Sequence, residues 1–205
     1  MKNIFLKITF AVFILGCLSS CTEDETAIPT IVPLLFSEDF PEAEINFNAD
    51  FDFVGWTNFA EAGTKKWVER DFNGSGYIQF SSFGSGNVSN IGWAITPAIN
   101  MDATTNEVFT FKSASNYVSD ASNKLEVLIS TNFDGTNVLA ATWTPLSAVV
   151  ANQTTNNFTY IPSGEINLSS YSGNIHLAFK VTGSGTNTNL DGLYQIDDVK
   201  VYSKN

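Results

Sequence analysis

The sequence predicts an all-β domain, an antiparallel β-sandwich of the jelly-roll type. Apolar and polar residues alternate along several short segments, as they do in strands with one buried face. Turn sequences such as FDGTN at 133–137 and GSGTN at 183–187 separate these segments. We find no amphipathic helix. About eight to ten strands fit the length, which favours a jelly roll over an immunoglobulin fold of about 100 residues.

Residues 1–20 are predicted to be a lipoprotein signal peptide. Lys2 and Lys7 precede an apolar run over 8–18, which is shorter than the about 20 residues of a membrane-spanning helix. The segment resembles a bacterial lipobox, with possible cleavage before Cys17 or before Cys21. We favour Cys21 as the lipidation site, because Cys17 lies within the apolar run and acidic residues follow Cys21. A plain secreted protein is the alternative.

Residues 21–33 are expected to form a flexible tether, and residues 34–205 a single β-jelly-roll domain. The chain carries a formal net charge of −11. Nucleic acid is therefore an unsuitable partner, because phosphate binding needs a basic patch. A membrane is expected to be contacted only through the lipid anchor. The acidity suits solubility or the binding of divalent cations.

Three segments show the strand pattern most clearly. Residues 108–112 and 124–130 alternate, and the second of these places Leu125, Val127 and Ile129 on one face. Residues 174–181 alternate in the same way, with Ile175, Leu177, Phe179 and Val181 predicted to point inward. These strands are expected to supply much of the core.

Carboxylates interrupt the apolar faces of the first and last strands. Glu38 shares its parity with Phe36 and Phe40, and the alternation slips across Asp197 and Asp198. Either a β-bulge lies at this position or Asp198 shares a face with Ile196. A buried carboxylate is costly unless it is paired or bound to a metal. We therefore expect Glu38 with Asp197, Asp198 or both to hold a structural Ca²⁺; ordinary edge carboxylates are the alternative.

The order of several motifs resembles the choice-of-anchor J and cleaved-adhesin group of bacterial jelly-roll domains, and more distantly MAM domains. The motifs include GWAITPAINM at 92–101, LEVLIST at 125–131 and YQIDDVKVY at 194–202. The resemblance covers roughly residues 36–202. It implies a galactose-binding-like fold with structural calcium near the chain ends. By position it implies Glu38, Asp198 and Asp197 as ligands, with Asp71 as a weaker addition.

The sequence argues against an enzyme. His176 is the one histidine and is expected on the outer face of its strand, and no Gly-x-Ser-x-Gly elbow supplies a nucleophile. A zinc site is not expected, because the domain lacks the histidine and thiolate ligands that zinc needs. Pairs of acidic residues are too numerous to indicate a glycosidase.

Binding is the alternative to catalysis, and the four tryptophans are the natural candidates. Trp56 and Trp93 lie in the motif-like segments and are expected in the core. Trp67, surrounded by charged residues, and Trp143 are the predicted exposed aromatics for ligand binding.

The resulting hypothesis is a monomeric, non-catalytic module on a lipoprotein of the bacterial outer-membrane surface; a secreted or periplasmic protein is the alternative. Its ligand is expected to be a glycan or an extracellular protein. A scaffold subunit of a surface complex, and less plausibly a hydrolase, are the other functions considered.

Overall fold

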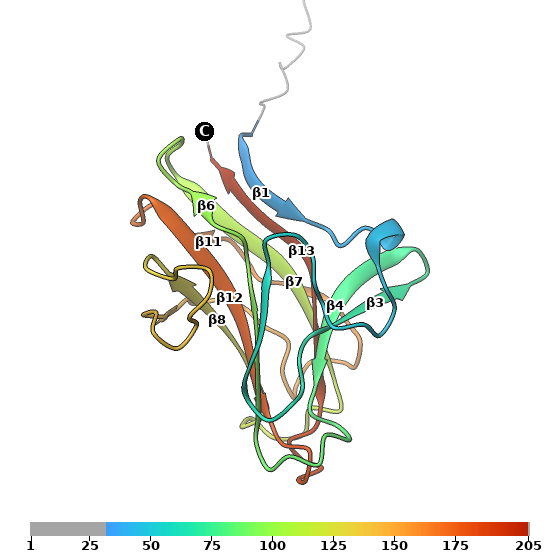
Figure 1. Cartoon of the computed structure of the whole chain (residues 1–205). Helices are drawn as coiled ribbons and strands as arrows, with labels where there is room; N and C mark the ends of the chain where they lie inside the picture. Colours follow the sequence, from blue (N-terminus) through green and yellow to red (C-terminus); the bar gives the residue numbers. More distant parts are fainter. Residues whose placement is uncertain (1–31, 205) are drawn as a thin grey trace, which may run out of the picture. The chain divides into compact units, whose positions relative to one another are not determined.

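Two antiparallel β-sheets pack face to face in the computed structural model (Figure 1). The structure describes residues 32–204, apart from the side chain of Ala43. The predicted signal peptide, Cys17, Cys21 and most of the predicted tether lie outside the described residues. Within 32–204, no helix is long and apolar enough to cross a membrane.

The larger sheet has seven strands in the order β10-β7-β13-β4-β3, with β1 paired to β13 and β11 paired to β7. Their bounds are β1 Leu34–Glu38, β3 Val68–Phe72, β4 Ser75–Ser81, β7 Glu107–Asn116, β10 Ile161–Pro162, β11 Ile166–Asn167 and β13 Leu193–Ser203. The first and last strands therefore lie side by side (Figure 1).

The smaller sheet has six strands in the order β2-β5-β12-β8-β9, with β6 paired to β12. Their bounds are β2 Thr57–Ala62, β5 Asn90–Ile95, β6 Ile99–Asn100, β8 Lys124–Ser130, β9 Thr144–Pro145 and β12 Asn174–Gly183. One turn of 3₁₀ helix, Glu42–Glu44, follows β1.

The predicted fold class is confirmed, and the clearest strand predictions hold. The inward faces of 124–130 and 174–181 are buried as expected, in β8 and β12. The described part has thirteen strands rather than eight to ten. The additional strands include β9, β10 and β11, which have two residues each and are too short to show a period.

The core lies between the two sheets. Phe111 of β7 meets Phe179 of β12 edge to face, with ring centroids 5.0 Å apart. Phe109 packs beside both rings. Such aromatic contacts bury large apolar areas in favourable geometry, so they join the sheets strongly.

Trp67 belongs to this core, and the prediction that it is exposed is wrong. Its side chain is 0% exposed and its ring packs on that of Phe80, 5.8 Å away. The Asn58 side chain accepts a hydrogen bond from the Trp67 N–H and donates one to the Trp67 carbonyl oxygen. The neighbouring charges misled the prediction, because Lys66 points outward and Glu69, which is also buried, accepts backbone N–H groups of Asn46 and Asp52.

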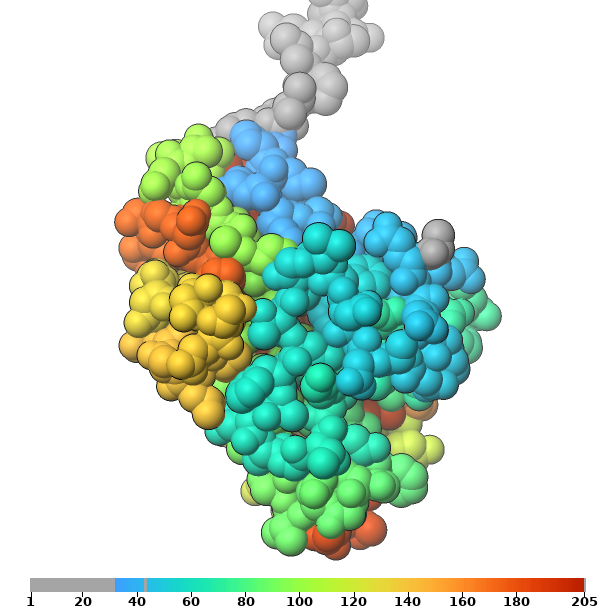
Figure 2. All heavy atoms as spheres, in the orientation of Figure 1, coloured from blue at the N-terminus to red at the C-terminus, as the bar shows by residue number. Residues whose placement is uncertain are grey.

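A second apolar cluster lies on the outer face of the smaller sheet, under the loop 131–143. Figure 2 shows this loop, in yellow, as a compact group of atoms on the surface. Trp93 of β5 is buried there, as expected of a core tryptophan, and its ring meets that of Trp143 at 5.2 Å. Trp56 is half-buried and packs against the main core.

Candidate functional site

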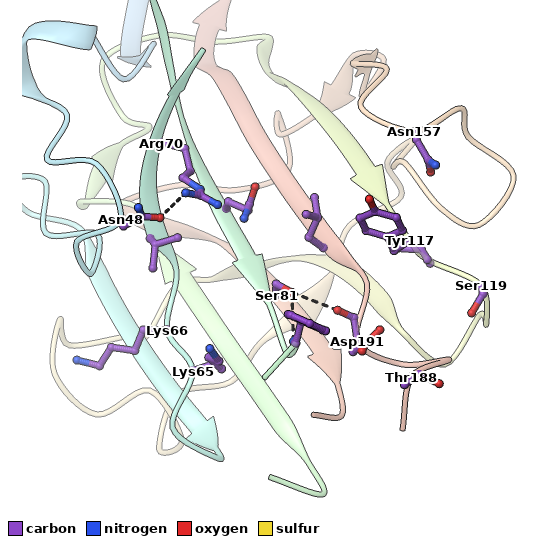
Figure 3. A pocket seen from close by; sticks show the side chains of 15 residues that line it. Asn48, Lys65, Lys66, Arg70, Ser81, Tyr117, Ser119, Asn157, Thr188 and Asp191 are labelled. Atoms are coloured by element: carbon purple, nitrogen blue, oxygen red, sulfur yellow. Dashed lines mark hydrogen bonds between the residues drawn. The ribbon is translucent and has the colours of Figure 1, made fainter. Parts of the chain in front are cut away.

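A groove of about 1060 Å³ lies over the outer face of the larger sheet, the face turned away from the smaller sheet (Figure 3). It crosses the strands from β3 at the sheet edge, over β4 and β13, to the end of β7. Three strand spacings separate β3 from β7, so the groove spans about 14 Å across the sheet. That span suits a chain of linked units better than a single small molecule.

The alternation of the strands places polar side chains in the groove. In β4, Ile78 and Phe80 point into the core, so Gln79 and Ser81 point to the opposite face. The register pairs Gln79 with Val68 of β3 and Ser81 with Leu193 of β13, and both partners also line the groove. The groove floor is thus built on regular strands.

Gln79 of this floor is hydrogen-bonded to Gln195 of β13, which is buried and does not itself line the groove. The Gln195 side-chain nitrogen donates a hydrogen bond to the Gln79 side-chain oxygen at 3.0 Å. Gln79 is only 7% exposed and lines the groove, and its own amino group donates to no acceptor among residues 32–204. Its side-chain nitrogen is not among the fully buried atoms that lack a partner within residues 32–204, so it is accessible from the groove and can donate to a ligand hydroxyl.

Two exposed aromatic side chains line the same groove. Tyr117 is 70% exposed and Phe83 is 71% exposed. Tyr117 has a φ of +58°, a left-handed conformation that is unusual for a bulky residue and concentrates at functional sites. Gly192 lies directly against it, since a Cβ there would be 2.8 Å from the Tyr117 carbonyl group.

The two ends of the groove differ in charge. Figure 3 shows Lys65, Lys66 and Arg70 on one side, Tyr117, Ser119 and Thr188 on the other, and Ser81 and Asp191 between them. The Ser81 hydroxyl donates to the Asp191 carbonyl oxygen at 3.1 Å, which ties β4 to the loop before β13. Sequence reasoning missed all of these residues because their chain segments meet only in the sheet.

The predicted irregularity at Asp197 and Asp198 is a β-bulge. The register of β13 against β7 shifts between Asp197 and Lys200, and Asp198 has a φ of +54°. The Asp198 carboxylate forms ion pairs with Lys112, at 3.1 Å, and with Lys200. Burial acts to raise the pKa of Asp198, but the hydrogen bonds from Lys200 and Lys112 outweigh it and lower that pKa.

The four predicted calcium ligands are not assembled into one set. Asp197 and Asp198 line a hollow of about 320 Å³ together with Asp39 and Lys112, whereas Glu38 and Asp71 do not line it. Among the described residues, no group of three or more His, Cys, Asp or Glu side chains is placed to hold a metal ion. A cation would also have to compete with the lysine partners of Asp198. Calcium binding therefore stays a prediction.

Burial raises the pKa of the Glu38 carboxyl, although the backbone N–H of Phe40, 3.0 Å away, donates to it and opposes the shift. Burial likewise raises the pKa of Asp197, and the negative charges of Asp198 and Asp39 add to the effect. Both carboxyls thus sit in surroundings that disfavour their charge.

The other predicted residues do not line the groove: His176 lies on β12 of the smaller sheet, and Trp143 lies in the loop that covers its outer face. Trp143 is half-buried, and its indole N–H donates to the Val138 carbonyl oxygen at 2.9 Å. His176 is half-buried beneath the Phe133 ring rather than open to solvent. Its Nδ1 lies 2.8 Å from the Thr96 carbonyl oxygen, which can only accept, so Nδ1 carries the proton.

Comparison with protein families gives one assignment. The family described as a domain of unknown function, DUF5017, matches residues 47–204, which cover every groove residue. The chain belongs to the DUF5017 family. A search of the curated proteins finds no match to this DUF5017 chain.

Solved structures show the same fold as this DUF5017 domain at low sequence identity. The K1 cleaved-adhesin domain of Lys-gingipain from Porphyromonas gingivalis W83 matches with a TM-score of 0.50 and 16% identity, over 83% of this chain and 98% of that chain. The K3 domain of the same protein gives 0.50 and 17%, over 83% and 99%. The CBM22-1 xylan-binding domain of Paenibacillus barcinonensis Xyn10C gives 0.47 and 14%, over 85% and 97%. The resemblance to cleaved-adhesin domains is thus confirmed for the fold.

Proposed function

We propose that this DUF5017 domain is a non-catalytic glycan-binding module whose site is the groove on the larger sheet. The observation that carries the proposal is the combination, in one groove, of exposed Tyr117 and Phe83 with the side-chain amino group of Gln79, which is held in place by the bond from Gln195 to the Gln79 oxygen. Sugar rings present apolar faces and hydroxyl groups. Aromatic rings bind the former and side-chain amides bind the latter.

The groove has the size and lining of a ligand site. Its volume is slightly above the usual range for small-molecule sites, and most of its lining side chains are polar or charged, with two exposed aromatic rings among them. A partner protein would be expected to need a larger, flatter surface, of about 800 Å² on each side. The hollow therefore favours a glycan over the scaffold role. The fold shared with cleaved-adhesin domains is compatible with either.

The proposal includes attachment to the cell surface. We keep the sequence-based expectation that Cys21 is lipidated and that residues 21–33 tether the domain to the outer membrane. A monomeric domain on such a tether can reach polymeric ligands outside the cell.

Affinity electrophoresis of the full chain through gels containing different polysaccharides tests the proposal. We expect retardation by at least one polysaccharide, and a loss of about tenfold or more in affinity for Tyr117→Ala and Phe83→Ala. Phe72→Ala is the matched control, because Phe72 is 70% exposed but does not line the groove. Migration unchanged by every polysaccharide would overturn glycan binding and favour a partner protein.

A further inference from the structure

The cations of the domain are distributed unevenly between ion pairs and the groove. The described residues contain seven lysines and one arginine. Five of these have a carboxylate partner at 3.1 Å or less: Lys112, Lys124, Lys180, Lys200 and Lys204. The remaining three are Lys65, Lys66 and Arg70, and all three line the groove.

These three side chains keep most of their positive charge available. Within residues 32–204, Lys65 and Arg70 have no carboxylate oxygen within 4.0 Å, and Lys66 meets Asp50 only at 3.6 Å with both side chains exposed. Such an exposed pair contributes little energy and can be exchanged readily. In a chain of formal net charge −11, one groove end is thus lined by cations.

Arg70 is positioned without being neutralised. Its guanidinium donates to the Asn48 side-chain oxygen and lies over the Phe47 ring, 4.9 Å from the ring centroid. Neither contact supplies a negative charge, so the guanidinium is held in place while its remaining donors stay free for a ligand. A planar guanidinium is suited to bind a carboxylate or sulfate through two hydrogen bonds.

From this arrangement we infer that the groove binds an anionic glycan, with a carboxylated or sulfated sugar unit at the end formed by Lys65, Lys66 and Arg70. The inference rests on the proposed glycan-binding function and adds the charge class of the ligand. Asp191 lies nearer the opposite side, so a second anionic unit there would be repelled (Figure 3). The structure thus favours a glycan in which acidic and neutral units are mixed, with the neutral unit beside Tyr117.

Paired polysaccharides distinguish this inference from glycan binding in general. The probes are chondroitin sulfate, desulfated chondroitin and carboxyl-reduced desulfated chondroitin, together with glucuronoxylan and unsubstituted xylan. We expect an acidic member of one series to bind at least about tenfold more tightly than its neutral form. Comparing the affinity for desulfated chondroitin with the affinities for the other two forms shows whether carboxylate or sulfate is the group recognised.

Charge variants test whether the cations are responsible. The double variant Lys65→Gln with Arg70→Gln is expected to lose about tenfold or more in affinity for the acidic probe. Lys124→Gln with Lys204→Gln makes the same change in net charge outside the groove and is expected to keep the affinity. Binding of the wild type should weaken as salt rises from about 0.01 M to about 0.15 M, and the groove variant should respond less. Unfolding midpoints confirm that each variant is folded.

The outcomes separate the two proposals. Equal or tighter binding of the neutral forms would overturn the anionic inference and leave the glycan-binding function standing. An equal loss of affinity in the groove and control variants would also overturn it, since the effect would then follow net charge. Binding of no polysaccharide at all would overturn both proposals.

Discussion

The side chain of Gln195 on β13 donates a hydrogen bond to the side chain of Gln79 on β4, 3.0 Å away beneath the groove. Gln195 is 3% exposed, so water does not replace this bond easily. We expect Gln195→Met to lower the free energy of unfolding by about 1–3 kcal/mol, because the Gln79 oxygen would lose a buried donor. Urea unfolding measures the change, and Gln153→Met at an exposed position is the control. Equal stability of the two variants would show that the bond is not needed.

Trp67 and Phe83 are expected to respond differently to truncation. Trp67 is fully buried, so Trp67→Ala should destabilise the domain by about 3–5 kcal/mol through cavity formation. Phe83 is largely exposed, so Phe83→Ala should change stability by no more than about 0.5 kcal/mol. Thermal unfolding compares them. A small loss for Trp67→Ala would contradict the observed core.

The charge of Asp197 is expected to destabilise the folded domain at neutral pH. Burial raises its pKa when folded, so the folded state binds this proton more tightly than the unfolded chain does. This destabilisation by the Asp197 charge disappears as pH falls through the raised folded pKa toward the unfolded pKa of about 4. Asp197→Asn should therefore raise the unfolding midpoint at pH 7 and lose that advantage near pH 4.

Asp198 should show the opposite sign. Hydrogen bonds from Lys200 and Lys112 outweigh burial and lower its pKa, so its charge stabilises the folded state. This contribution is present above the unfolded pKa and is lost as pH falls through the lower folded value. Asp198→Asn should lower the midpoint at pH 7. Equal shifts for the Asp197 and Asp198 variants would contradict the assigned environments.

The predicted calcium site near the paired chain ends can be tested by thermal unfolding. If Ca²⁺ binds only the folded state, calcium at 100 times its dissociation constant should add about 2.7 kcal/mol to stability. The unfolding midpoint in excess calcium should then be higher than the midpoint in EDTA. This difference is expected both in the wild type and in Glu165→Ala, which changes an exposed residue and serves as the control. Glu38→Ala and Asp198→Ala should abolish the difference. If EDTA does not change the unfolding midpoint of the wild type, the calcium hypothesis is wrong and the lysines are the relevant partners of Asp198.

Lipidation at Cys21 can be followed by metabolic labelling with a fatty acid. Cys21→Ser should lose the label, whereas Cys17→Ser should keep it because residue 17 would be removed with the signal peptide. The reverse pattern would move the anchor to Cys17. An unlabelled wild type would support secretion without an anchor.

The sequence by itself was sufficient for the fold class and for the faces of β8 and β12. Their alternation extends over residues 124–130 and 174–181, and burial of one strand face imposes this local pattern. The irregularity at Asp197 and Asp198 was also predictable, because an inserted residue breaks the same alternation, but the sequence left a bulge and a shared face with Ile196 as alternatives. Local periodicity therefore predicted the features that depend on a single strand.

Only the tertiary structure decided where the candidate site lies. Lys65, Gln79, Tyr117 and Asp191 are far apart in the sequence and share a groove because β3, β4, β7 and β13 are neighbours in one sheet. The same packing buried Trp67, whose charged neighbours had indicated exposure. It also surrounded Asp198 with Lys112 and Lys200. A residue's local sequence determines the face of its strand, but the strands that fold against that face determine its partners.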